Sequence, residues 1–175
     1  MLHSNYPIDI LDEQGNVIGS KPRIELDKHH DRYASANILL ITPRGELIVQ
    51  TIPPNETLPN IYVGRLGVLA TVRWSGESSL AAAQRCMARE LFIDDMKLTK
   101  LGEKMHDLPD GRREWLAAFY GIAEMPSNFS PVDIESLVVI TPKQLDALAA
   151  SEKPLDTIAV NLLAIWQTYR HKLPL

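Results

Sequence analysis

The residues best suited to chemistry gather in one stretch of this 175-residue sequence, TVRWSGESSLAAAQRCMARELFI, which covers residues 71–93. Glu90 follows Glu77 by thirteen positions. On a helix, Cys86, Arg89 and Glu90 would share one face, because side chains three and four positions apart are neighbours. Carboxylates on such a face are the oxygen ligands that Mg²⁺ prefers, whereas a guanidinium offers a fork of donors that matches phosphate oxygens directly.

A helix is predicted to position these side chains. The segment from Ser78 to Leu91 contains neither Gly nor Pro, and Ser78 is a suitable N-cap residue. Its apolar residues recur at near-helical spacing, which is typical of a helix that packs one face on a core. They are Leu80, Ala83, Met87 and Leu91.

The same stretch resembles the box motif of the Nudix hydrolase superfamily, Gly-x5-Glu-x7-Arg-Glu-U-x-Glu-Glu-x-Gly-U, where U is a bulky aliphatic residue. Glu77, Arg85 and Glu90 stand at matching positions, and Met87 and Ile93 occupy the two aliphatic ones. The box is degenerate at four positions. Thr71 and Phe92 replace its glycines, and Cys86 and Arg89 replace two of its helix glutamates.

In the Nudix superfamily, this helix face carries three carboxylates that hold Mg²⁺ ions against a diphosphate. Here it carries one glutamate, one arginine and one cysteine, so the formal charge changes from −3 to 0 if the thiol is neutral. A divalent ion about 4 Å from a unit charge interacts by about 8 kcal/mol at an effective dielectric constant of about 20. Replacing a glutamate by an arginine turns such an attraction into a repulsion, so weak or absent Mg²⁺ binding is expected.

The resemblance covers most of the chain and is closest to the Nudix branch that includes isopentenyl-diphosphate isomerase. DILDEQGNVIG is similar to the N-terminal hairpin of that branch, PRGELIVQ to its strand before the box, and LPNIY to its Pro-Gly-Leu-Trp turn. REWLAAFYG resembles the following strand, where the branch places metal-binding glutamates. Glu114 fits one of these positions, and Arg112 stands at another. The resemblance therefore implies Glu90 and Glu114 as metal ligands, and Glu90, Glu77 and Glu114 as catalytic carboxylates.

Three functions are compatible with these residues. The first is binding of a diphosphate-containing small molecule with hydrolysis weakened or lost, in which Arg89, with Arg73 or Arg112, takes over part of the metal's role. The second is an active Mg²⁺-dependent nucleoside diphosphate-X hydrolase that uses the three carboxylates named above. The third is a pseudoenzyme kept as an interaction module, with the apolar C-terminal helix as its partner surface. Isomerase activity ranks last, because the loop LGVLATVRWSG lacks the cysteine and histidine that the isomerase branch uses.

Ordinary structural roles stay open for each of these residues. Glu77 would also suit the start of a helix, where the helix dipole favours a carboxylate. Cys86 would suit a semi-buried position on the helix. Arg89 and Glu90 would suit an ordinary solvated pair on a surface helix. Glu114 would equally suit an exposed strand position. His29 and His30 are adjacent and point in different directions, which favours a solvated loop over a metal site.

The other elements predict an α+β fold, the Nudix α/β/α sandwich with a mixed central sheet, in a single domain over residues 1–175. Strands are expected in an N-terminal hairpin over about 6–20, in a second hairpin around Pro43-Arg44-Gly45, and over 61–72, 115–122 and 136–140. Residues 20–34 are predicted to form a loop or short helix, and residues 53–60 a loop. Two further helices are expected over 142–150 and about 156–170, the second one capped by Asp156.

Composition limits the partners and the compartment. The chain has 22 acidic and 18 basic residues, a net charge of −4, so no basic surface for nucleic acid is expected. No apolar run is long enough to cross a bilayer, and the N-terminus does not resemble a signal peptide. The single cysteine fits a reducing compartment, so a cytoplasmic protein is predicted. A homodimer is expected only because homodimers are common among relatives, and the sequence does not fix the ligand's identity.

Overall fold

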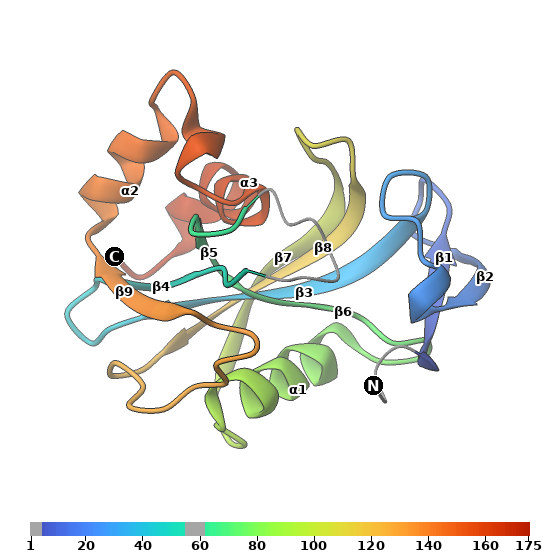
Figure 1. The fold of residues 1–175 in the computed structure, drawn as a ribbon, viewed down its shortest axis with the longest axis horizontal. Coiled ribbons are helices and arrows are strands. Elements are labelled where there is room, and N and C mark those ends of the chain that lie inside the picture. Colours follow the sequence, from blue (N-terminus) through green and yellow to red (C-terminus); the bar gives the residue numbers. More distant parts are fainter. Residues whose placement is uncertain (1–4, 55–61) are drawn as a thin grey trace.

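The computed structural model describes residues 5–54 and 62–175, which form a two-stranded sheet, a seven-stranded mixed sheet and three α-helices (Figure 1). The strands are β1 (Pro7–Leu11), β2 (Val17–Pro22), β3 (Arg32–Ile41), β4 (Leu47–Thr51), β5 (Leu66–Gly67), β6 (Leu69–Val72), β7 (Leu98–Asp107), β8 (Arg113–Ile122) and β9 (Ser136–Ile140). The helices are α1 (Ser79–Leu91), α2 (Pro142–Ala149) and α3 (Val160–Tyr169). Most of the loop predicted over 53–60 lies outside the described residues, as does most of the LPNIY turn.

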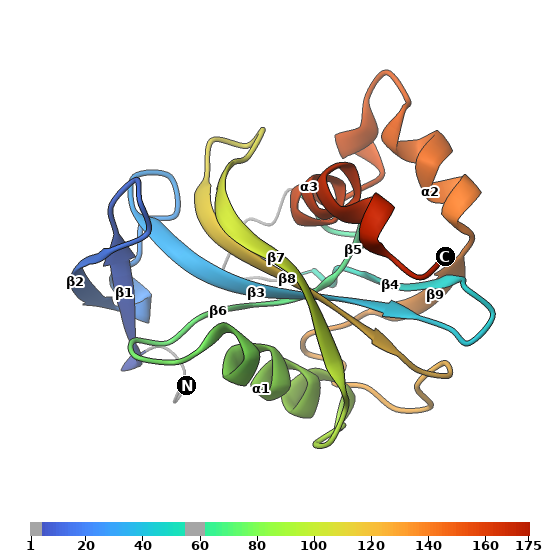
Figure 2. The ribbon, with the colours of Figure 1, turned by 180° about the vertical axis from the view of Figure 1, so that it is seen from behind.

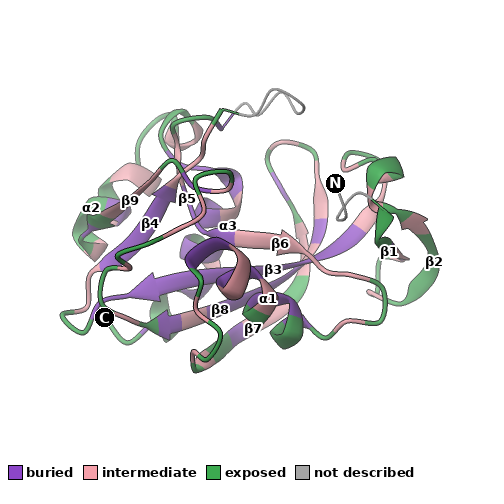
Figure 3. Cartoon of the chain, turned by 60° about the horizontal axis from the view of Figure 1, so that its bottom comes forward, coloured by how far each residue is buried: buried purple, intermediate pink, exposed green. Residues whose placement is uncertain are grey.

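Strand β3 is the centre of the large sheet. It pairs in parallel with β8 and antiparallel with β4 and β6, and it is buried almost throughout (Figure 3). Successive side chains of a strand point to opposite faces of the sheet. Ala36 and Ile38 of β3 therefore join the core under α1, whereas Leu39 and Ile41 join the core under α3. Figure 2 shows the two helices on opposite sides of the sheet, which confirms the predicted α+β sandwich with a mixed sheet. These sides are called the α1 face and the α3 face below.

The N-terminal hairpin is confirmed, although β2 continues to Pro22. Its turn needs Gly15, whose φ is +84° and where a Cβ atom would lie 2.7 Å from the ring of Trp115. The segment predicted as a loop or short helix contains one 3-10 turn, Arg23–Glu25, and then bends back toward the start of β3. The hairpin and the segment after it are thereby held against one end of the large sheet.

Three elements differ from the sequence predictions. The strand expected over 61–72 is divided into two short strands, β5, which pairs with β4, and β6, which pairs with β3. Strand β7 was not predicted, because it is an edge strand with one buried residue, Leu101, and a bulge between Lys100 and Gly102 that breaks the alternation. Helix α3 begins at Val160, so the prediction that it begins at Asp156 was wrong. The backbone N–H of Leu66 donates to the carbonyl of Thr157, and that of Ala159 donates back to the carbonyl of Leu66, which holds Ile158 and Ala159 in a bridge to Leu66 and out of the helix.

No helix in the described part of the chain is both long enough and apolar enough to span a membrane.

Candidate functional site

Helix α1 begins where the sequence predicts. The Ser78 hydroxyl accepts a hydrogen bond from the Ala81 N–H at 3.1 Å, which is the N-cap bond. Just before it, Glu77 accepts from Nε of Arg85 at 2.8 Å and from the backbone N–H of Trp74 at 3.0 Å. The guanidinium of Arg85 also lies 3.8 Å from the centroid of the Trp74 ring. The Glu77–Arg85 pair therefore fastens the loop before the helix to the helix itself, and a catalytic role for Glu77 stays a prediction.

Helix α1 ends at Leu91, and its C-cap is Phe92, the residue that the sequence resemblance aligns with a glycine of the box. Its φ is +58°, in the left-handed region, and its backbone N–H donates to the carbonyl of Met87. Such a cap usually requires glycine, because a side chain in this region is strained. The phenylalanine side chain is 55% exposed, so it gains little from burial. The chain thus keeps the backbone conformation of a helix cap without the residue that suits it.

The variant Phe92→Gly should be more stable than Phe92→Ala by about 1 kcal/mol, because only glycine relieves the left-handed strain. Urea unfolding of the two variants followed by circular dichroism would measure the difference. Both variants lose the same exposed ring, so each is the other's control. An alanine variant as stable as the glycine variant would contradict the assigned backbone strain.

The predicted box face is present on α1 and lies turned inward. Glu90 is only 3% exposed, and its Oε1 accepts from Nη2 of Arg89 and from the Sγ of Cys86, the latter at 3.3 Å. Nη1 of Arg89 lies 3.5 Å from the hydroxyl oxygen of Thr71, and its Nε lies 3.7 Å from a carboxylate oxygen of Asp133. Arg89 and Glu90 therefore form an ion pair with a buried carboxyl group and a partly exposed guanidinium, and the alternative of a fully solvated surface pair was wrong.

These side chains do not fit a divalent cation. Burial raises the pKa of Glu90 to about 7, against the opposing effect of Arg89, and it raises the pKa of the Cys86 thiol well above its usual value. Mg²⁺ would therefore meet one weakly acidic carboxyl group, a neutral thiol and a guanidinium in place of hard oxygen ligands. Over residues 5–54 and 62–175, no group of three or more His, Cys, Asp and Glu side chains could hold a metal ion.

The stability of the wild type should fall as the pH rises from about 5 to about 8, by up to about 3 kcal/mol relative to Glu90→Gln. A carboxyl group whose pKa is raised from 4.5 to about 7 keeps a proton that the unfolded chain has already released. Its contribution is therefore complete below about pH 4.5 and lost as the pH passes 7. Urea unfolding at both pH values checks this, with Glu135→Gln as the exposed control. If the free energies of unfolding of the wild type and of Glu90→Gln changed with pH in the same way, the raised pKa of Glu90 would be contradicted.

Glu114 lies on β8 and is 2% exposed, so the alternative of an exposed strand position was wrong. Each of its oxygens accepts two hydrogen bonds. The donors are the Tyr33 hydroxyl at 2.8 Å, the Ser35 hydroxyl at 2.8 Å, Nη1 of Arg112 at 2.9 Å and Nδ2 of Asn161 at 3.2 Å. Four donors match the four lone-pair sites of a carboxylate. Glu114 therefore has no free lone pair for a metal ion in this arrangement.

The two glutamates predicted to share a metal are not brought together. Ala117 of β8 packs in the core under α1, whereas Leu116 packs in the core under α3. Because side chains alternate along the strand, Glu114 points to the α3 face. Glu90 comes from α1 itself, on the other side of the sheet. The prediction that Glu90 and Glu114 are metal ligands therefore stays a prediction. The structure places the two side chains on opposite faces of the sheet.

The three predicted phosphate-binding arginines are also separate from one another. Arg89 pairs with Glu90 as described. Nη1 of Arg73 donates to Oε1 of Glu103 at 3.2 Å, beside a cavity of about 440 Å³ between the start of α1 and β7. Arg112 belongs to the α3 face with Glu114. Glu103 was missed from the sequence because the strand that carries it, β7, was not predicted.

Arg112 is the centre of a polar cluster that the sequence did not indicate. Its Nε donates to Asp110 at 2.6 Å, its Nη1 to Glu114 and its Nη2 to Asn161 at 2.9 Å. Lys28, in the segment between β2 and β3, interacts electrostatically with Arg112, and Arg23 interacts with Lys28 and Tyr33. Burial, reinforced by Arg23, lowers the pKa of Lys28 to about 8, and burial also lowers the pKa of Arg23. This group is called the Arg112 cluster. It comprises Arg23, Lys28, Tyr33, Asp110, Arg112, Glu114 and Asn161.

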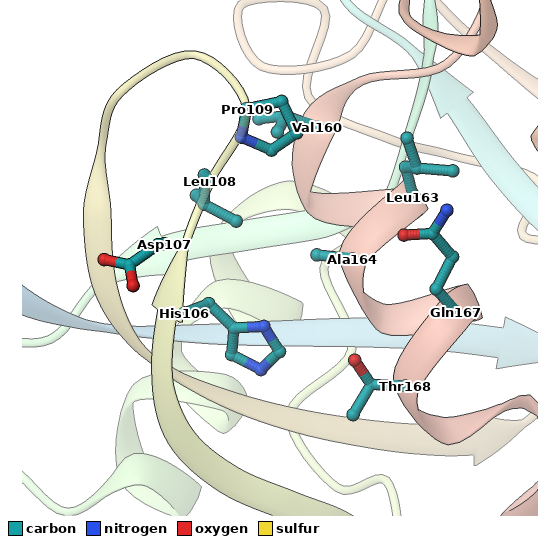
Figure 4. Close-up of a pocket in the computed structure, with 9 residues that line it drawn as sticks. All are labelled: His106, Asp107, Leu108, Pro109, Val160, Leu163, Ala164, Gln167 and Thr168. Atoms are coloured by element: carbon teal, nitrogen blue, oxygen red, sulfur yellow. The ribbon is translucent and has the colours of Figure 1, made fainter.

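A cavity of about 160 Å³ lies on the same face, between the end of β7 and α3. Figure 4 shows His106 extending from the strand toward Ala164 and Thr168 of the helix. Nε2 of His106 is buried without a hydrogen-bond partner in the described residues, and burial lowers the pKa of its imidazole. No sequence pattern singles out His106, since no second ligand stands at a suitable spacing from it.

Comparisons with known proteins place this arrangement in a family. No protein-family model matches the chain. A Deinococcus radiodurans protein of known structure aligns with a TM-score of 0.73 and 20% identity over 93% of this chain and 98% of its own. The Nudix domain of NrtR from Shewanella oneidensis, solved with ADP-ribose, aligns with a TM-score of 0.55 and 9% identity over 87% of this chain and 92% of its own. An uncharacterised Nudix hydrolase of Pseudomonas aeruginosa is 32% identical over 135 residues, which are 76% of this chain and 77% of that protein. The predicted Nudix fold is thereby confirmed, and the chain belongs to the Nudix hydrolase family.

Proposed function

We propose that this Nudix protein binds a diphosphate-containing small molecule and that its box no longer supports Mg²⁺-dependent hydrolysis. The observation that carries the proposal is the inward ion pair of the box face, where Arg89 neutralises the buried carboxylate of Glu90. In this chemistry a cation normally activates water and neutralises the leaving phosphate. Without this cation, binding of the ligand gives no rate enhancement where the protein binds the substrate and the transition state equally well.

We also propose that the four departures from the box are real changes at aligned positions. One contact and one backbone conformation support this alignment. Glu77 and Arg85 pair across eight positions, and Phe92 adopts the left-handed backbone expected of the closing glycine. Membership of the isomerase-like branch is supported by the N-terminal hairpin and by the neighbouring positions of Arg112 and Glu114. The cytoplasmic location and the homodimer are retained as part of the proposal.

The ligand class follows from the family, and ADP-ribose, which the NrtR domain binds, is the first candidate. The test is a panel of ADP-ribose, other nucleoside diphosphate derivatives and isoprenoid diphosphates, each with Mg²⁺ or with EDTA. Thermal unfolding and released phosphate are measured in parallel. At a ligand concentration of about 100 Kd, binding should stabilise the fold by about 2.7 kcal/mol.

The proposal expects stabilisation that persists in EDTA, with no phosphate released under either condition. Mg²⁺-dependent release that Glu90→Ala abolishes would contradict it in favour of the active hydrolase. Absence of any response to every compound would contradict it in favour of an interaction module. Glu135→Ala, an exposed carboxylate with no side-chain partner among the described residues, is the control for the Glu90 variant.

A further inference from the structure

The cavity of about 440 Å³ between the start of α1 and β7 lies at the edge of the large sheet (Figure 3), and it is called the β7 cavity here. The register of β7 on β8 directs two charged side chains into it. Lys100 pairs with Phe119, and both line the cavity. Glu103 pairs with Ala117, which belongs to the core under α1. Because opposed side chains of an antiparallel pair lie on the same face, Lys100 and Glu103 lie on the α1 face.

The β7 cavity is separate from the box residues that face β6. Arg85 and Arg89 of α1 both reach Thr71 of β6, with Nη1 atoms at 3.2 and 3.5 Å from its hydroxyl oxygen. Strand β6 pairs with β3, whereas β8 stands between β3 and β7 in the sheet. None of these three residues lines the cavity. A ligand in the β7 cavity would therefore occupy a second site, on the other side of α1.

Two cations share one carboxylate at the polar end of the β7 cavity. Oε1 of Glu103 accepts three hydrogen bonds, from Nη1 of Arg73 at 3.2 Å, from the Ser79 hydroxyl at 2.7 Å and from Nε1 of Trp115 at 3.1 Å. Its other oxygen accepts from Nζ of Lys100. Arg73, Lys100 and Glu103 together carry a formal excess of one positive charge, in a chain whose net charge is −4.

The two cations keep hydrogen-bond donors that the described residues do not use. A guanidinium has five N–H donors and an ammonium has three. Arg73 directs Nη1 at Glu103 and at Ser79, the latter at 3.3 Å, so its Nε and Nη2 groups remain. Lys100 directs one N–H at Glu103 and keeps two. Charged donors of this kind form strong hydrogen bonds with phosphate or carboxylate oxygens.

The remainder of the lining is mostly apolar. Leu80 extends from α1, Leu98 from β7 and Phe119 from β8. Phe119 is buried in the core under α1, whereas Leu80 is 44% exposed. The volume falls within the range of about 300 to 1,000 Å³ that is typical of small-molecule sites, and it is far larger than one phosphate ion. A ligand that fills the cavity therefore needs an apolar body as well as a charged group.

We propose that the β7 cavity binds a small organic anion. Lys100 and Arg73 hold its oxyanion group, and its apolar body packs on Leu80, Leu98 and Phe119. The flexible stem of Lys100 carries a point charge that suits either a phosphate or a carboxylate, and the guanidinium of Arg73 offers a planar fork to the same oxygens. This inference goes beyond the proposed function, because it assigns a second site to another class of ligand.

The test is isothermal titration of hexyl phosphate, butyl phosphate, hexanoate and inorganic phosphate into the wild type. Hexyl phosphate should bind about 10-fold more tightly than butyl phosphate, because each buried CH₂ group lowers Kd by about fourfold. Inorganic phosphate has no apolar body and should bind more weakly than either. The comparison of hexyl phosphate with hexanoate identifies which oxyanion the site prefers.

Variants of the cavity test its two ends separately. Lys100→Met should raise the Kd of hexyl phosphate by about 10-fold, because it removes a charge-assisted contact, and Lys100→Arg should restore binding. The matched control is Lys104→Met, since Lys104 is exposed on the same strand and pairs in register with Leu116 of the core under α3. Leu80→Trp should also weaken binding, because it fills the cavity without changing its charge. Circular dichroism shows that each variant is folded.

The outcomes are distinct. Equal Kd values for Lys100→Met and Lys104→Met would overturn the charged end of the site. Equal binding of hexyl phosphate and inorganic phosphate would overturn the apolar end and indicate an adventitious ion only. If neither hexyl phosphate nor hexanoate binds the wild type, the inference is wrong, and the proposed function, which is tested with ADP-ribose and other diphosphates, is unaffected.

Discussion

Replacing Glu114 by alanine should lower the free energy of unfolding by about 3 to 5 kcal/mol, because it leaves the buried guanidinium of Arg112 without this partner. The carboxylate is 2% exposed and accepts four hydrogen bonds. Its removal also leaves the hydroxyls of Tyr33 and Ser35 buried without their acceptor, which adds to the loss. Urea unfolding of the two proteins at neutral pH measures the difference.

Two further variants separate the ion pair from general effects of mutation. Glu135→Ala, on the exposed surface, should change stability by less than about 0.5 kcal/mol. Arg112→Met combined with Glu114→Leu removes the guanidinium together with its Glu114 partner, but it leaves the Asp110 carboxylate without that guanidinium, so it should recover only part of the loss. A loss below about 1 kcal/mol for Glu114→Ala would mean that the cluster is more hydrated than its burial indicates.

Placing glutamates at the two proposed box positions, Cys86→Glu with Arg89→Glu, should raise the affinity for Mn²⁺ or Mg²⁺ by about 100-fold or more. The double change removes one cation from the face and adds two carboxylates beside Glu90. Each charge about 4 Å from a divalent ion contributes about 8 kcal/mol at an effective dielectric constant of about 20, before desolvation. A gain of 100-fold needs only about 2.7 kcal/mol of that sum.

The matched control is Cys86→Gln with Arg89→Gln, which has side chains of the same size and no added charge. Isothermal titration with Mn²⁺ gives the affinity, and a rise in melting temperature with added Mn²⁺ shows that the restored variant is folded and binds. Equal affinity in the two double variants would show that residues 86 and 89 are not the metal positions of the box.

The parts of the fold that carry a local signal were predictable from the sequence. Helix α1 has apolar residues at helical spacing and a serine cap, and the structure places it within one residue of the prediction. Strands β3 and β4 are continuous apolar runs around Pro43-Arg44-Gly45, which is typical of strands buried on both faces. The shared face of Cys86, Arg89 and Glu90 follows from helix geometry alone.

The parts set by contacts distant in sequence were not predictable. The start of α3 depends on hydrogen bonds between residues 157–159 and Leu66, about ninety positions away. Glu114 and Glu90 belong to opposite faces because of how β8 enters the sheet, and no local pattern encodes this. Lys28 stands in a polar segment that is typical of a surface loop. Only the folded chain shows that Arg23, Arg112 and Glu114 act on it electrostatically.

The most direct test is a crystal structure of the wild type with ADP-ribose in a high concentration of MnCl₂, examined by anomalous diffraction. The account predicts bound ADP-ribose and no manganese peak beside Glu90. Manganese ions bound to the carboxylate of Glu90, with Arg89 displaced and a diphosphate bridging them, would contradict it.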